Sequence, residues 1–254
     1  MASGVITGIA CGLLVGAAGL ALRGGSRSDP RLRDAIRAVA GVATALLFAA
    51  GAVAIWQHHK ETVSTGQAIV AGVLGALQTA PLRLVLMAAV GAIPTASRSR
   101  REPEAYAIAL CPSVVAAGAA LLAWSGTALA DVSTAPSGAT LLELVYSLVL
   151  VACYSVGTLA LADGLADLVA TEPTHRAAPA ARAGYVLLTM LVGCTALASL
   201  FQRGSAWGLA VAEIPPVAAW LAWSAAWLGI PQRRLVRSTL NLVGSGLLFL
   251  AAVL

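Results

Sequence analysis

The sequence has little charge and few aromatic side chains. Only 11% of its 254 residues are charged and 5% are aromatic, whereas 59% are hydrophobic. A soluble domain usually carries about 25% charged residues. Water cannot cover so much apolar surface without a large penalty, so lipid must take part of it. The composition therefore excludes an ordinary soluble fold and favours an integral membrane protein.

Compact catalytic and metal-binding motifs are also absent. The sequence has no Walker loop and no HExxH, GxSxG or CxxC pattern, and its adjacent His58 and His59 cannot face one way on a helix. The cysteines are far apart and are typical of small apolar filler in helix packing: Cys11, Cys111, Cys153 and Cys194. We therefore expect no catalytic residue, metal or cofactor, and an enzyme is disfavoured. We also expect no nucleic-acid partner, because the basic residues lie in short loops between apolar runs.

Long apolar runs dominate the rest of the chain. A membrane-spanning helix needs about 20 such residues, and its backbone hydrogen bonds must be satisfied within the segment. Eight runs qualify: 3–22, 37–57, 67–95, 105–125, 140–170, 183–202, 205–230 and 236–254. The first ten residues lack the basic region of a cleavable signal peptide, so we expect the first run to be a helix. The predicted fold class is all-α, a polytopic membrane protein of about eight transmembrane helices.

Basic residues alternate between the connecting loops. The first, third, fifth and seventh loops hold thirteen arginines, while the three other loops hold only Lys60 and Arg203. Loops rich in Lys and Arg stay in the cytoplasm. Both termini are therefore predicted to lie outside the cytoplasm. The bias toward arginine and alanine favours a bacterial source, and hence the inner membrane.

Two proline-bearing segments resemble each other. Gln78 precedes Pro81 by three residues, as Glu213 precedes Pro216, and each segment then reaches an Ile-Pro pair and an arginine cluster. The pattern predicts a tandem duplication of a four-helix unit, with units at 1–130 and 131–254. An even number of spans per unit would place both units the same way up in the membrane.

Glu213 is the most informative single residue. It lies about eight residues into the seventh run, where an ionisable side chain is costly and normally faces the bundle interior or a wet cavity. Such a carboxyl group could take up a proton or bind a cation. Gln78 occupies the equivalent place in the third run. The alternative is a structural acid that ties two helices together.

Arg83 is the natural partner for this acid. It is the only basic residue well inside a predicted span, and a buried Arg–Glu pair would offset two desolvation costs. Pro81, Pro215 and Pro216 are expected to kink their helices and free carbonyls near Gln78 and Glu213. The predicted transport or ion-binding residues are therefore Glu213, Gln78, Arg83, Pro81 and Pro216.

Three further patterns have plainer interpretations. Glycines at positions 4, 8, 12 and 16 predict a close-packing face on the first helix. Asp163 and Asp167 lie four residues apart on one face at the end of the fifth run, where paired acids could gate a cation path, but a solvated helix end is the expectation. The tryptophans of the seventh run fit an interface belt or a contact with another subunit: Trp207, Trp220, Trp223 and Trp227.

The glycine-striped first run and the arginine-rich turns resemble the proteolipid subunits of rotary ATPases. The stretch at 169–193, VATEPTHRAAPAARAGYVLLTMLVG, is similar to the turn and second helix of such a hairpin. The resemblance implies an ion-carrying ring subunit. That family carries its ion-binding carboxylate in the second helix of a hairpin, and here the even-numbered runs contain no Asp or Glu.

Two classes of function remain open. The main prediction is a transporter of a small solute, proton or cation, coupled through Glu213. The alternative is a non-catalytic membrane subunit of a larger complex, including a proteolipid-like subunit. The first predicts a wet cavity that reaches Glu213. The second predicts a dry core and an apolar face, lined by glycine or tryptophan, for partners or for a second copy of the chain in the bilayer.

Overall fold

The computed structural model describes residues 2–23, 30–62, 79–93, 103–127, 141–169, 177–204, 214–227 and 234–253. Within these ranges the chain forms eight helices and no strand. The helices are α1 (Ala2–Arg23), α2 (Pro30–Thr62), α4 (Ala80–Ala92), α6 (Pro103–Thr127), α7 (Leu141–Val169), α8 (Ala177–Arg203), α9 (Ile214–Trp227) and α10 (Arg234–Val253). The predicted all-helical membrane fold is confirmed.

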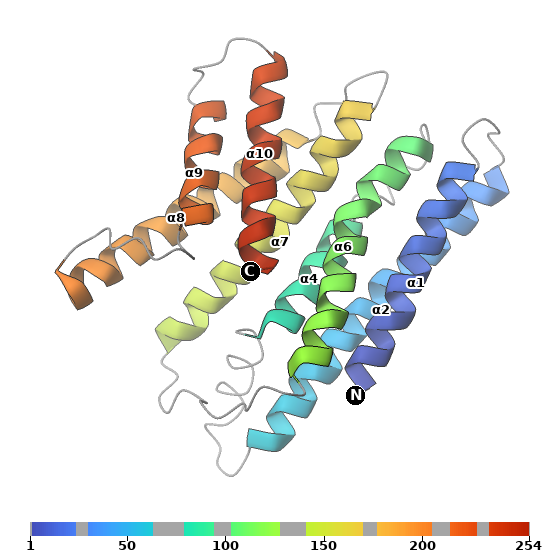
Figure 1. Ribbon diagram of the computed structural model, residues 1–254, viewed down its shortest axis with the longest axis horizontal. Helices are drawn as coiled ribbons and strands as arrows, with labels where there is room; N and C mark the ends of the chain where they lie inside the picture. The colour runs from blue at the N-terminus through green and yellow to red at the C-terminus, as the bar shows by residue number, and fades with distance from the viewer. Residues whose placement is uncertain are drawn as a thin grey trace.

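Successive helices run in alternate directions across a single bundle (Figure 1). α1 packs on α2 and α6, and α4 packs on α2, α6 and α7. In the second half α7 packs on α8 and α10, and α9 packs on α8 and α10. The two groups of four helices meet where α7 and α10 contact α4 and α7 contacts α6. The predicted units at 1–130 and 131–254, and their origin by duplication, remain predictions.

Apolar length divides the described helices into two classes. Among the described residues, five helices are long and apolar enough to cross a membrane, with spans at Ala2–Arg23, Pro30–Gln57, Glu104–Trp124, Leu148–Val169 and Leu235–Ala252. The apolar segments Pro81–Ala92, Pro179–Cys194 and Ile214–Ala226 are shorter, and the second of them is part of the 27-residue α8. The third and seventh predicted spans therefore correspond to described helices of 13 and 14 residues. Their preceding segments, 63–78 and 205–213, lie outside the described residues.

A seam of small side chains joins α1 to its neighbours. The buried positions of α1 recur at alternating steps of four and three residues: Ser3, Thr7, Ala10, Leu14, Ala17 and Ala21. Buried residues of α2 follow the same steps: Ile36, Ala40, Ala43, Leu47 and Ala50. This is the heptad spacing of two helices packed at a shallow angle. Because most of these side chains are alanines, the helices can approach closely.

The glycine stripe of α1 does not form this seam, so among the described residues it is not a packing face within the chain, and its predicted role in packing against another subunit remains a prediction. A Cβ added at Gly4, Gly12 or Gly16 would meet no other atom within 4 Å, and at Gly8 it would make only ordinary contact with Leu121 at 3.8 Å. Glycines spaced every four residues drift around a helix that repeats every 3.6 residues. The stripe therefore turns away from the heptad seam along α1, from the half-buried Gly4 and Gly8 to the exposed Gly12 and Gly16.

Single glycines admit large side chains in the second half of the bundle. Leu248 of α10 lies against Gly157 of α7, where an added Cβ would be 2.6 Å from its Cδ2. Leu242 of α10 fills the space beside Gly164 in the same way. The contacts run in opposite order along the two helices, so α7 and α10 pack antiparallel with leucine knobs in glycine holes.

Trp223 of α9 is fully buried where α8, α9 and α10 meet, so its predicted place in an interface belt is wrong. An added Cβ at Gly184 would lie 2.8 Å from the indole Cη2, and one at Gly244 would lie 2.5 Å from Cδ1. The indole Nε1 donates a hydrogen bond to the carbonyl oxygen of Asn241 at 3.1 Å. The two glycines create the slot, and the hydrogen bond satisfies the buried donor.

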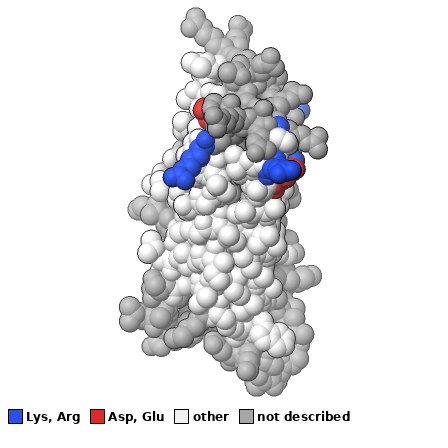
Figure 2. Space-filling model, turned by 90° about the vertical axis from the view of Figure 1, so that its right-hand side faces the viewer, with Lys and Arg blue, Asp and Glu red and all other residues white. Residues whose placement is uncertain are grey.

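The described charged side chains lie together on one face of the molecule. Figure 2 shows basic and acidic side chains grouped toward the upper part of this face, above a broad band of described residues without charge. The band is the surface expected of helices in contact with lipid tails, where charged groups are costly. Together with the five long apolar helices, it places the protein in a membrane as a multi-pass protein.

Candidate functional site

The short helix α4 lies at the centre of the bundle. It contacts α2, α6, α7 and α10, and nearly all of its side chains are buried, including Leu82, Leu84, Val85 and Met87. A helix that is apolar on all sides belongs in a core. At about 1.5 Å per residue its 13 residues rise about 20 Å, less than the ~30 Å of the hydrocarbon layer.

Arg83 places a positive charge in the first turn of this central helix. Its flanking residues Leu82 and Leu84 are 1% and 2% exposed. Its Nε is buried and has no hydrogen-bond partner among the residues that the structure describes. A buried guanidinium donor without a partner costs free energy. Arg83 therefore has a physical reason to meet an anionic or hydrogen-bond-accepting group.

The depth of Arg83 follows from the contact of α4 with α2. A Cβ added at Gly51, in the middle of α2, would lie 3.3 Å from Cδ1 of Leu82. Gly51 is 14 residues beyond Arg37 in the same helix, which is about 21 Å at the rise of an α-helix. Arg83, next to Leu82, therefore lies well below Arg37.

Both proline-bearing segments begin helices. Pro81 occupies the first turn of α4 after the extended Thr79, and Pro215 and Pro216 occupy the first turn of α9. The expected kink is therefore wrong for the described helices. A first-turn residue has no intrahelical acceptor for its N–H, so a proline there breaks no hydrogen bond. Pro81 is buried and Pro216 is half-buried.

The two other predicted site residues, Gln78 and Glu213, lie outside the described residues. Each directly precedes a described segment, at Thr79 and at Ile214. The helices that follow them, α4 and α9, both pack against α10. The Arg83–Glu213 pair remains a prediction.

A close approach beside the far end of α4 was missed by sequence reasoning. A Cβ added at Gly91 would lie 2.7 Å from Oγ of Ser113 on α6 and 2.9 Å from Cγ2 of Thr158 on α7. Thr158 satisfies its hydroxyl through the carbonyl oxygen of Tyr154 at 3.0 Å. Gly91 thus fixes the junction of three helices. An isolated glycine in an apolar run carries no periodic signal that would have identified it.

Asp163 is another correction to the sequence interpretation. It is only 7% exposed, although a solvated helix end was expected, while Asp167 is half-buried. The reason is that α7 is packed by α4, α6, α8 and α10. No group of three or more His, Cys, Asp or Glu side chains that could hold a metal ion occurs among the described residues.

Comparisons with known proteins found a similar fold in one solved structure but no match in sequence. No family model matches the chain, and no curated protein matches it in sequence. A solved structure, "Cytochrome c Heme Lyase CcmF", superposes with a TM-score of 0.67 at 16% identity. The fold is similar to part of CcmF. The match covers 98% of this chain and 45% of CcmF, so the chain spans less than half the length of that lyase.

Proposed function

We propose that the protein is a non-catalytic membrane subunit of a larger complex. The similarity to CcmF over nearly the whole chain carries the proposal. In CcmF a similar helical arrangement is only one part of a longer protein. The apolar centre supports it: fully buried side chains of α4 include Val85, Met87, Ala88 and Ala89. Such a core is what the subunit interpretation requires.

The outward face of α1 also supports this proposal. Gly4, Gly12 and Gly16 have no neighbouring atom in reach of an added Cβ, and Val5 and Ile9 on this helix are 65% and 54% exposed. Glycine faces allow membrane helices of different proteins to approach closely. The stripe that the chain does not use internally is thus available to a partner.

The name of CcmF suggests which complex to look for, one that attaches heme to cytochrome c. No residue of this chain is assigned to heme, which enters only as a candidate cargo of the complex. Visible absorption of the purified complex, compared with that of the isolated chain, tests this part of the proposal.

The decisive experiment is purification in mild detergent followed by mass measurement of the intact particle. We expect the chain with defined partner subunits. Gly12→Leu should release partners without unfolding the chain, because Gly12 has open space around it. Gly118→Leu on α6, another open position, is the matched control. A lone chain, with the same mass for both variants, would contradict the proposal.

The second candidate is the transporter with a site formed by Glu213, Gln78, Arg83, Pro81 and Pro216. The buried, unpartnered Nε of Arg83 favours it, because intramembrane charges are retained mainly at pathways and pairs. Glu213→Gln should then abolish proton-coupled uptake in reconstituted vesicles while the fold remains intact.

If Arg83 pairs with Glu213, Arg83→Leu and Glu213→Leu should each destabilise the chain by about 3–5 kcal/mol. The double variant should recover much of this loss. Full uptake in Glu213→Gln, or additive losses in the double variant, would rule this candidate out.

A further inference from the structure

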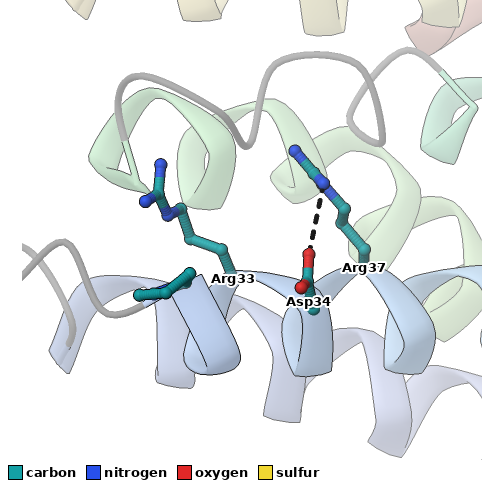
Figure 3. Close-up of a pocket in the computed structure, with 4 residues that line it drawn as sticks. Arg33, Asp34 and Arg37 are labelled. Carbon is teal, nitrogen blue, oxygen red and sulfur yellow. Dashed lines mark hydrogen bonds and ion pairs between the residues drawn. The ribbon is translucent and has the colours of Figure 1, made fainter.

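The first turns of α2 form a basic pocket that neither candidate function uses. Pro30, Arg33, Asp34 and Arg37 line an open pocket of about 320 Å³. Figure 3 shows Arg33 and Arg37 extending to the same side of the helix, with Asp34 between them. Residues four apart lie on one helix face, so two guanidinium groups border one opening.

The pocket lies where lipid headgroups are expected. The candidate membrane span of α2 extends from Pro30 to Gln57, and the ~20 residues that end at Gln57 suffice to cross the ~30 Å hydrocarbon layer. The eight residues from Pro30 to Arg37 therefore extend about 11 Å beyond that layer. Charged groups on the face in Figure 2 lie above the uncharged band, in agreement with this placement.

The charges of the pocket favour an anion. Nη1 of Arg37 lies 3.3 Å from Oδ1 of Asp34, and the side chain of Asp34 is 74% exposed. One well-hydrated carboxylate against two guanidinium groups leaves an excess positive charge. A guanidinium has five N–H donors, so Arg37 can bind a phosphate oxygen while it keeps its contact with Asp34. Arginine also matches the geometry of phosphate better than lysine does.

We propose that Arg33 and Arg37 bind the phosphate of an anionic phospholipid headgroup in this pocket. The acyl chains of that lipid extend along the apolar surface of α2 below it. Inorganic phosphate shares the same chemistry, but only a lipid is held in the headgroup layer at high local concentration. The bound lipid fixes the depth of α2 in the bilayer. The proposal does not depend on whether the protein is a subunit or a transporter.

The test uses the full chain purified in detergent and native mass spectrometry with added phosphatidylglycerol or phosphatidylcholine. The wild-type chain should retain phosphatidylglycerol in preference. Arg33→Gln with Arg37→Gln should weaken this binding about 30-fold, the equivalent of about 1 kcal/mol for each basic residue. Asp34→Asn should strengthen it, because a competing carboxylate is removed. Circular dichroism and thermal unfolding establish that each variant is folded.

The control is the double variant Arg182→Gln with Arg237→Gln, which removes the same charge from exposed positions of α8 and α10. Equal weakening by this control would show diffuse attraction and overturn the site. Displacement of the lipid by millimolar inorganic phosphate would identify a free-phosphate site and overturn the lipid assignment. Equal retention of the two lipids by the wild-type chain would overturn both the binding site and its assignment to an anionic lipid.

Discussion

In α1 glycine recurs every four residues, whereas the glycines of α7, α8 and α10 follow no such repeat. Space beside Gly4, Gly12 and Gly16 stays open. The slots at Gly184 and Gly244 are closed by the indole of Trp223. A regular stripe is thus a weak guide to internal packing, because four-residue spacing drifts around the helix. We therefore expect a glycine opposite a large side chain to contribute more to the stability of this bundle than a glycine of the stripe.

Removal of a tryptophan is expected to give the largest difference in unfolding free energy between the two regions. Trp223→Ala empties a slot bounded by Gly184 and Gly244 and should lower the free energy of unfolding by about 3–5 kcal/mol. Trp56→Ala is the matched control, because Trp56 of α2 is 68% exposed and its loss leaves no cavity. Unfolding in a detergent-to-SDS titration measures both. Similar losses for the two variants would contradict the difference between the regions.

A methyl group added to the same slot is the next test. At Gly244 a Cβ would lie 2.5 Å from Cδ1 of Trp223 and 3.2 Å from the backbone oxygen of Ala219. Backbone cannot shift away easily, and the indole is held by Gly184 on its other side. Gly244→Ala should therefore cost about 1–3 kcal/mol of unfolding free energy. A wild-type melting temperature would show that the slot is looser than its contacts indicate.

Much of this architecture was predictable from the sequence. Apolar runs about 20 residues long identified the helices, because lipid requires both the length and the internal hydrogen bonding. The third span was predicted too long as a single helix, since hydropathy does not register that Thr79 is extended and that α4 begins beside Pro81. Burial of Trp223 was not predictable, because it depends on glycines in two other helices.

The candidate site was predicted only in part. Arg83 was recognised because a charge in an apolar run is rare, and the structure places it in the central helix α4. The buried position of Asp163 was not foreseen. Sequence position placed it at a helix end, whereas its burial comes from four helices that pack around α7. Nearness to a helix end does not measure exposure when neighbours extend past that end.

In α1 a glycine-to-alanine substitution is expected to stabilise the chain, whereas Gly244→Ala is expected to destabilise it. Gly12→Ala adds a methyl group in open space and removes a helix-weakening residue, which should stabilise the isolated chain by about 0.4–1 kcal/mol. The same substitution at Gly184, where a Cβ would lie 2.8 Å from Trp223, should destabilise it. Thermal unfolding of the two variants side by side measures the contrast. Destabilisation by Gly12→Ala would mean that the stripe packs within the chain after all.

The smallest effect is expected from the second tryptophan hydrogen bond of α9. Nε1 of Trp220 donates to Oγ1 of Thr189 on α8 at 3.0 Å, in an exposed position. Hydrogen bonds between membrane helices contribute about 0.6 kcal/mol on average, because the unfolded segments also find partners in the bilayer. Trp220→Phe keeps most of the ring and removes the donor, and Thr189→Val removes the acceptor at similar volume. A double-mutant cycle with unfolding free energies should give a coupling near this value, well below the loss in Trp223→Ala. A coupling as large as that loss would place the main anchor of α9 at Trp220, on its outer face, instead of at the buried Trp223.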